Sequence, residues 1–128
     1  MQTVAQLMTR NLLILHAESS LRDAIAYLAT EHVSGAPVVN GTGRLVGAVS
    51  SSDLLQAQAE DMDLDATPVS DVMTSPTLTV TPGTELREAA LAMEYGDVHR
   101  LFVVEGDALL GVISRSDVSR ALATGQIS

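Results

Sequence analysis

Two short stretches of the sequence carry the same polar residues after an aliphatic run. Gly47-Ala48-Val49-Ser50-Ser51-Ser52-Asp53 is matched by Gly111-Val112-Ile113-Ser114-Arg115-Ser116-Asp117. One ionised carboxylate such as that of Asp117 can accept two adjacent hydroxyl donors in charge-assisted hydrogen bonds. An Asp in the first turn of a helix is stabilised by the helix dipole and stays ionised. Alternatively, these Ser and Asp residues serve only as helix N-caps.

Positive charge gathers around the second stretch and is absent from the first. His99, Arg100 and Arg115 are the basic residues concerned, and Arg can hold a phosphate with two parallel hydrogen bonds. The equivalent residues of the first half are Ser34, Gly35 and Ser51. We therefore expect a phosphate contact only in the second half, with a simple surface pair, His99-Arg100, as the alternative.

The two stretches belong to an internal repeat. An offset of 65 residues brings Val4-Ala5-Gln6-Leu7-Met8-Thr9 onto Val69-Ser70-Asp71-Val72-Met73-Thr74, and after a one-residue deletion the offset becomes 64. We interpret residues 1–128 as one domain. Repeat 1 covers about 1–59, an acidic connector about 60–68 and repeat 2 about 69–128.

Each repeat has the pattern of a strand, a helix, two strands and a second helix, which predicts an α+β fold. Apolar residues at 21, 24, 25 and 28, and at 86, 89, 90 and 93, follow the spacing of one buried helix face. Ser19 and Thr84 are the expected N-caps of these helices. The predicted extended segments are 12–15, 36–39 and 45–49, then 78–80, 101–104 and 109–113, and Met8 and Met73 are expected to open equivalent strands and to fill the core.

The composition restricts the classes of function. The chain has 128 residues, 46% of them apolar, no cysteine and a formal charge of −9. This charge opposes a nucleic-acid backbone, so we expect no nucleic-acid partner. No apolar run is long enough to span a membrane and no leader pattern is present, so we expect a soluble, cytoplasmic protein.

Motifs for metal binding and catalysis are missing or incomplete. Asp61-x-Asp63-x-Asp65 resembles the start of a calcium loop, but Ala66 stands where glycine is needed and Val72 where glutamate is needed. No nucleophile elbow, phosphate loop or dinucleotide fingerprint occurs. We therefore predict no metal site, no catalytic cofactor and no enzymatic activity.

The duplicated pattern with Gly-apolar-apolar-Ser-x-x-Asp after each hairpin resembles the CBS domain pair, or Bateman module. In that family the Ser and Asp hold the ribose of an adenosine ligand, which implies Ser114 and Asp117, and Ser50 and Asp53, as ribose-binding residues. The second repeat is similar to the gamma subunits of AMP-activated protein kinase, where a His-Arg pair contacts phosphates. This implies His99, Arg100 and Arg115 as phosphate-binding residues.

The resemblance also implies two clefts, each built from both repeats. Around the Asp117 ligand, the base pocket would contain Thr3, Met8, Val33, Ser34, Ala36, Ile113 and Ser116. The Asp53 cleft would use Thr74, Val98 and the strand from Leu101. The repeats would pack face to face with pseudo-two-fold symmetry, and two chains would form a homodimer.

We therefore predict a regulatory module that senses AMP, ADP or ATP and acts on an effector protein that the sequence does not identify. Two alternatives stay open. The first is a structural module that dimerises and has vestigial clefts. The second is a site for S-adenosylmethionine, which shares the ribose and base and lacks the phosphates.

Overall fold

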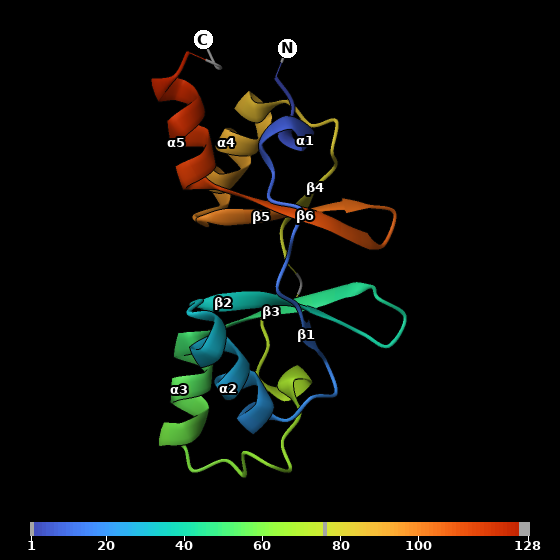
Figure 1. The fold of residues 1–128 in the computed structure, drawn as a ribbon, viewed down its shortest axis with the longest axis vertical. Helices are drawn as coiled ribbons and strands as arrows, with labels where there is room; N and C mark the ends of the chain where they lie inside the picture. The colour runs from blue at the N-terminus through green and yellow to red at the C-terminus, as the bar shows by residue number, and fades with distance from the viewer. Residues whose placement is uncertain (1, 76, 126–128) are drawn as a thin grey trace. The chain divides into compact units, whose positions relative to one another are not determined.

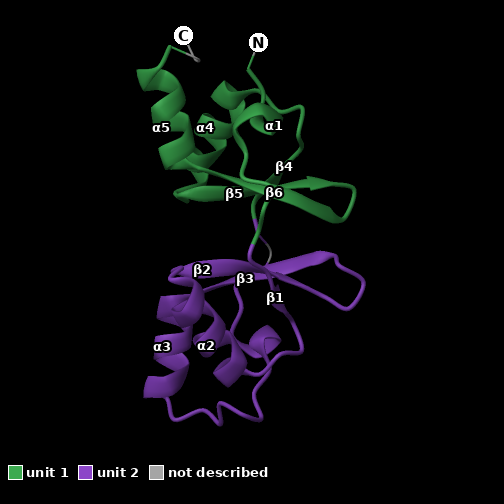
Figure 2. Ribbon diagram, viewed as in Figure 1, with its two compact units in different colours: residues 1–12, 78–128 green, residues 13–77 purple. Residues whose placement is uncertain are grey.

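The computed structural model describes residues 2–75 and 77–125, which form two compact units (Figure 2). Unit 1 consists of Met1–Leu12 and Leu78–Ser128, and unit 2 of Leu13–Thr77. The units therefore differ from the sequence repeats at their ends. The opening segment of repeat 1 belongs to unit 1, which otherwise comes from repeat 2, and the opening segment of repeat 2 belongs to unit 2, which otherwise comes from repeat 1 and the connector.

Unit 2 contains a three-stranded sheet and two helices (Figure 1). Strand β1 pairs in parallel with β2, and β2 pairs antiparallel with β3, in the order β1-β2-β3. A turn at Asn40 joins β2 to β3, and the Asn40 carboxamide oxygen accepts hydrogen bonds from the backbone N–H groups of Thr42 and Arg44. The elements are β1 (Leu15–His16), α2 (Leu21–Glu31), β2 (Gly35–Val39), β3 (Leu45–Ser50), α3 (Ser51–Ala59) and the 3-10 helix η1 (Val69–Asp71).

Unit 1 repeats this arrangement, with β4 parallel to β5 and β5 antiparallel to β6. The predicted order of strand, helix, strand, strand and helix is therefore confirmed in both halves, as is the α+β class. None of the helices in the described part of the chain is long and apolar enough to cross a membrane. The elements are α1 (Val4–Leu7), β4 (Thr79–Val80), α4 (Leu86–Gly96), β5 (Arg100–Glu105), β6 (Ala108–Ser114) and α5 (Arg115–Ala123).

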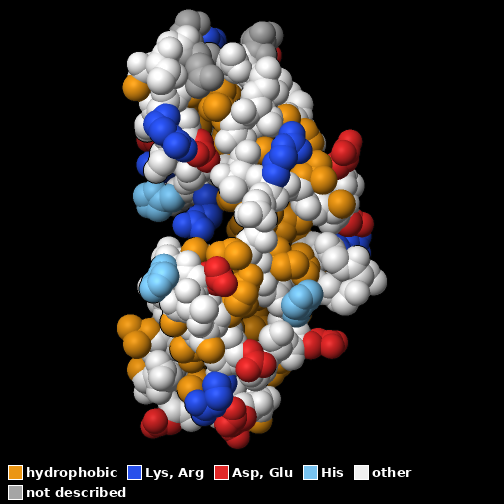
Figure 3. Space-filling view, viewed as in Figure 1, with side chains coloured by type: hydrophobic (Ala, Val, Ile, Leu, Met, Phe, Trp, Pro, Cys, Tyr) orange, Lys and Arg blue, Asp and Glu red, His pale blue; other side chains and the backbone are white. Residues whose placement is uncertain are grey.

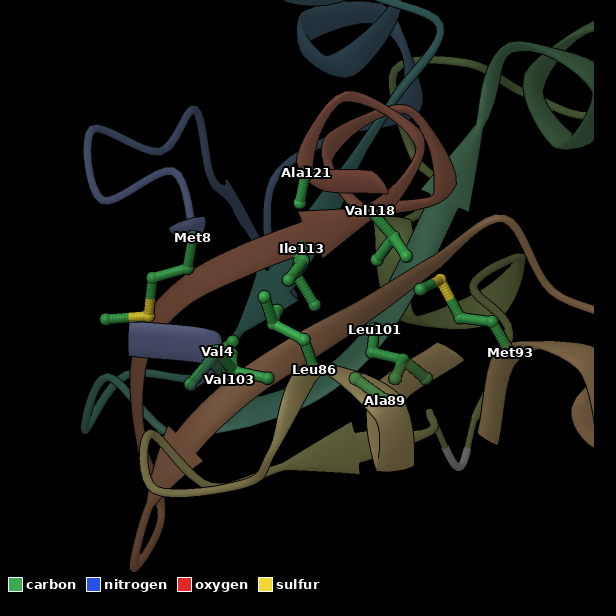
Figure 4. Close-up of a cluster of buried hydrophobic side chains, with 10 residues drawn as sticks. All are labelled: Val4, Met8, Leu86, Ala89, Met93, Leu101, Val103, Ile113, Val118 and Ala121. Carbon is green, nitrogen blue, oxygen red and sulfur yellow. The ribbon is translucent and has the colours of Figure 1, made fainter. Parts of the chain in front are cut away.

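Each unit has its own aliphatic core between the sheet and the helices. In unit 1 the predicted face of α4 supplies Leu86, Ala89 and Met93, which pack with strand residues such as Leu101 and Ile113 (Figure 4). In unit 2 the matching face of α2 supplies Leu21, Ala24 and Leu28. The helical periodicity therefore identified the buried faces correctly, while Ile25 and Ala90 are only partly buried.

Both predicted N-caps of these helices are wrong by one residue. Ser20, not Ser19, caps α2, and its hydroxyl accepts a hydrogen bond of 3.1 Å from the backbone N–H of Asp23. Glu85 precedes α4 without a side-chain cap. The hydroxyl of Thr84 instead accepts a hydrogen bond from the backbone N–H of Thr81 and so stabilises the turn before the helix.

The opening segments are less extended than predicted. Residues 4–7 form the short helix α1, so Met8 ends a helix and opens no strand. Met73 follows η1 in the same way. After each methionine one residue makes an isolated antiparallel bridge, from Thr9 to Val112 and from Thr74 to Ala48.

The acidic connector contains no helix or strand, but hydrogen bonds and an ion pair attach it to helix α2 of unit 2. The backbone N–H of Leu21 donates to the Thr67 carbonyl, and Arg22 pairs with Asp65 at 2.5 Å. The hydrogen bond and charge of Asp65 raise the pKa of Arg22. The Asp63 carboxylate accepts from the backbone N–H groups of Asp65 and Ala66, so it closes a turn of the connector.

Candidate functional site

The turn between β6 and α5 is a capping box formed by Ser114 and Asp117. The Ser114 hydroxyl accepts from the Asp117 backbone N–H at 3.2 Å, and Asp117 Oδ2 accepts from the Ser114 backbone N–H at 2.9 Å. Ser50 and Asp53 form the same box at the start of α3, with the same two distances. In both boxes, therefore, the Oδ2 atom of the Asp accepts a backbone hydrogen bond and Oδ1 takes no part in the capping box.

The second oxygen distinguishes the two copies. Arg120 lies one turn further along α5, and its Nη2 donates to Asp117 Oδ1 in an ion pair. The Asp117 side chain is 11% exposed and that of Arg120 is 74% exposed. In α3 the corresponding residue is Gln56, which instead donates to Glu60. Sequence reasoning missed Arg120 because it lies outside the Gly-to-Asp motif.

The predicted basic residues lie beside the Ser114–Asp117 turn. Arg100 is paired with Ser114 across the β5–β6 hairpin, and the Arg115 backbone N–H donates to the His99 carbonyl at 2.8 Å. The side chains of His99 and Arg100 are exposed. In the space-filling view, arginine and histidine side chains lie next to one another on this unit (Figure 3). The structure therefore brings all three predicted phosphate-binding residues to one turn.

Arg115 has a structural role that the sequence did not reveal. Its Nε donates to the Val98 carbonyl at 2.9 Å and its Nη2 to the Met93 carbonyl at 3.3 Å. Met93 lies in the last turn of α4 and its carbonyl also accepts from the Val98 backbone N–H, while Val98 follows the end of the helix. Part of the hydrogen-bonding capacity of Arg115 is therefore used inside unit 1.

The corresponding turn of unit 2 has the same backbone geometry without the charge. Gly35 is paired with Ser50, and the Ser51 backbone N–H donates to the Ser34 carbonyl at 2.8 Å. These pairings confirm the sequence alignment of the two halves at this turn. Five of the seven arginines belong to unit 1, whereas nine of the sixteen acidic residues belong to unit 2.

The predicted base-pocket residues are divided between the units. Several are buried, Ile113 with 0%, Ala36 with 4% and Met8 with 8% of their surface exposed. These three side chains belong to the hydrophobic cores of the units. Thr3, Met8, Ile113 and Ser116 belong to unit 1, and Val33, Ser34 and Ala36 to unit 2.

Unit 2 also contains a pocket of about 210 Å³ beside Asp53. Sequence reasoning did not predict it, because its walls come from α3, the connector and η1, which are separated in the sequence. In residues 2–75 and 77–125 no three His, Cys, Asp or Glu side chains are grouped so that they could hold a metal ion. The pocket is lined by Asp53, Gln56, Ala57, Glu60, Met62, Asp71 and Val72.

Comparison with known proteins identifies relatives over nearly the whole chain. The family model described as "CBS domain" matches residues 4–60 and 69–124. The crystal structure of CBSX2 in complex with AMP is 31% identical, with a TM-score of 0.85, and the match covers 99% of this chain and 100% of that chain.

Two curated relatives are longer than this chain. Uncharacterized protein MJ1225 of Methanocaldococcus jannaschii is 28% identical over 96% of the chain, which spans 44% of that protein. Inosine-5'-monophosphate dehydrogenase of Nitrosopumilus maritimus is 29% identical over 88% of the chain, which spans 22% of that protein. The chain thus spans less than half the length of both.

Proposed function

This chain belongs to the CBS domain family, and from that premise we propose that it is a regulatory module that binds an adenosine nucleotide, AMP, ADP or ATP, and performs no catalysis. The observation that carries the proposal is the position of Arg100 opposite Ser114, beside the capping box of Asp117. One turn of the chain thereby combines a carboxylate for hydroxyl groups with cationic side chains for phosphate.

Each residue of this turn has a role in the proposed complex. Asp117 accepts hydrogen bonds from the ribose hydroxyls, and Ser114 holds Asp117 in place through the capping box. His99 and Arg100 are exposed and bind the phosphate. Arg115 contributes its positive charge while its Nε and Nη2 hold the end of α4. CBSX2, which aligns with nearly this entire chain, was crystallised with AMP, and this supports an adenosine nucleotide as the ligand.

The regulatory part of the proposal concerns the conformation of the chain. A nucleotide bound at Asp117 would favour the arrangement of the chain that binds it more tightly. The ligand can shift that equilibrium only by its difference in affinity for the two arrangements. A larger protein or a separate effector would sense the change. The enzyme relative, of which this chain matches only a part, supports a role as one module of a larger system.

A different ligand is proposed for the turn at Asp53. Ser34, Gly35 and Ser51 provide no positive charge there, and the adjoining pocket contains Glu60 and Asp71. An anionic phosphate is disfavoured in such surroundings. A less charged adenosine compound, of which S-adenosylmethionine is the example, fits this turn better than ATP does.

We also propose that the chain forms a homodimer through the exposed surface of α4. Leu91 and Tyr95 lie one turn apart on α4, and they are 48% and 85% exposed. Such an apolar pair at the helix surface is suited to packing against a second copy. Sedimentation equilibrium of the wild-type chain and a Tyr95→Lys variant tests this: the wild type is expected to be a dimer and the variant to dissociate more readily, and a monomeric wild type would refute it.

The nucleotide proposal is tested by calorimetric titration of AMP, ADP, ATP, S-adenosylmethionine and adenosine. Asp117→Ala should weaken every ligand at this turn, whereas Arg100→Ala should weaken the phosphorylated ones selectively. Arg87→Ala, a change on the first turn of α4, is the matched control and should leave the affinities unchanged. Unchanged AMP affinity in Asp117→Ala would contradict the proposed site, and no binding of any compound would favour the scaffold alternative.

A further inference from the structure

The carboxylate proposed to bind ribose is already occupied by a side chain of the same helix. Arg120 Nη2 donates to Asp117 Oδ1, while the backbone N–H of Ser114 donates to Oδ2. A ribose that approaches Asp117 therefore meets a carboxylate with partners on both oxygens. Each oxygen keeps a further lone pair, but Asp117 is only 11% exposed and Arg120 lies against Oδ1, so a ribose that binds both oxygens competes with Arg120 for access to Oδ1.

Unit 2 provides an internal comparison. Its capping box has the same Ser, Asp and backbone distances, but Gln56 occupies the place of Arg120 and donates to Glu60. The two turns differ in charge at four places, where His99, Arg100, Arg115 and Arg120 replace Ser34, Gly35, Ser51 and Gln56. Among these four basic residues of the described chain, Arg120 is the one that contacts the carboxylate directly.

We propose that Arg120 is a specificity-determining residue that disfavours adenosine compounds without a phosphate at the Asp117 turn. An unphosphorylated ligand displaces the guanidinium from Asp117 and offers it no anion in return. A phosphorylated ligand brings a new negative charge close to the displaced side chain, which offsets the lost ion pair. This inference rests on the proposed function, since it concerns the selectivity of the same site.

The exposure of the two side chains sets the size of the effect. Arg120 is 74% exposed, so its guanidinium can leave the carboxylate for solvent without disturbing the core. Asp117 is nearly buried, but the arginine partner stays in solvent in either state, so we expect the penalty on an unphosphorylated ligand to be about two- to fivefold in affinity. Arg120 therefore adjusts ligand preference and does not close the site.

The test compares adenosine and AMP binding in the wild type and in Arg120→Gln, which introduces the side chain found at residue 56. We expect adenosine to bind about two- to fivefold more tightly to Arg120→Gln than to the wild type. AMP should bind with equal or lower affinity, so that the preference for AMP over adenosine falls. Arg87→Gln removes the same charge from α4 and should leave the preference unchanged.

The outcomes separate this inference from the proposed function. If AMP binds and Asp117→Ala weakens it, but Arg120→Gln leaves adenosine affinity unchanged or lower, the role of Arg120 is overturned and the site stands. If Asp117→Ala leaves AMP affinity unchanged, or if neither compound binds, the proposed site fails and the role of Arg120 fails with it. A purely structural role for Arg120 in α5 predicts no change in the ratio of the two affinities.

Discussion

Arg100 lies opposite Ser114 across the β5–β6 hairpin, in the position that Gly35 occupies opposite Ser50 in the β2–β3 hairpin. Directly opposed residues of antiparallel strands place their side chains on the same face of the sheet. Arg100 therefore shares a face with the Ser114 hydroxyl that caps α5. The same backbone framework carries a cation in one unit and only hydrogen at the equivalent α-carbon in the other.

This relationship predicts a salt-dependent affinity for AMP. Raising NaCl from about 0.05 M to about 0.5 M shortens the screening length and weakens contacts between exposed charges. AMP affinity should fall over this range and adenosine affinity should change little. In Arg100→Gln the salt dependence for AMP should be smaller, as measured by calorimetry at each concentration. Equal salt dependence in the wild type and the variant would argue against contact between Arg100 and the phosphate.

The capping boxes predict a loss of stability that needs no ligand. Ser114→Ala removes the hydroxyl that accepts from the Asp117 backbone N–H, and loss of such an N-cap costs about 1 kcal/mol. Ser50→Ala should cost a similar amount because the hydrogen bonds match. Urea unfolding of the ligand-free protein measures both. The exposed neighbour Ser116 is the control, and a Ser116→Ala variant as unstable as Ser114→Ala would contradict the capping assignment.

The sequence predicted the fold well where the periodicity was strong. The apolar spacing of α2 and α4 identified the buried faces, since a helix that covers a sheet needs one apolar stripe. The repeat alignment also predicted that Arg100 and Gly35 occupy equivalent places. The predicted start of α2 was wrong by one residue, because Ser19 and Ser20 are both good caps and local sequence does not choose between them.

The remaining features depend on contacts between distant segments. The sequence repeats begin at about 1 and 69, but residues 1–12 fold with the second half, and pairwise alignment contains no information about such an exchange. The hydrogen bonds of Arg115 to the Met93 and Val98 carbonyls depend on how α4 ends beside α5. Arg120 lies outside the repeated motif, so only the structure shows that it binds Asp117.

The segments that open the two repeats lie so close to Gly111 and Gly47 that we predict any side chain at these two glycines to destabilise the fold. A Cβ at Gly111 would lie 2.7 Å from the Thr9 carbonyl oxygen and 2.9 Å from Met8 Sδ. At Gly47 the corresponding distances are 2.8 Å to the Thr74 oxygen and 2.7 Å to Met73 Sδ. The methionine side chains can move, but the carbonyls belong to backbone bridges. Gly111→Ala and Gly47→Ala should each cost about 1–3 kcal/mol of unfolding free energy.

The control for these variants is Gly83→Ala, because a Cβ at Gly83 has no atom within 4 Å. Its stability should stay within about 0.5 kcal/mol of the wild type in the same denaturant experiment. If Gly111→Ala were equally neutral, the close approach of residues 8 and 9 to β6 would be incorrect.

The last prediction concerns the end of α2, where His32 adopts a left-handed conformation with φ of 55°. The following Val33 backbone N–H donates to the Leu28 carbonyl, which completes the hydrogen-bonding pattern of a helix C-cap that favours glycine. A left-handed conformation costs a residue with a Cβ about 1 kcal/mol, so His32→Gly should increase the unfolding free energy by up to about that amount. His16→Gly, in strand β1, should decrease it because glycine weakens a strand. Thermal and urea unfolding measure both variants, and a destabilised His32→Gly variant would show that the histidine side chain makes a favourable contact that outweighs its backbone strain.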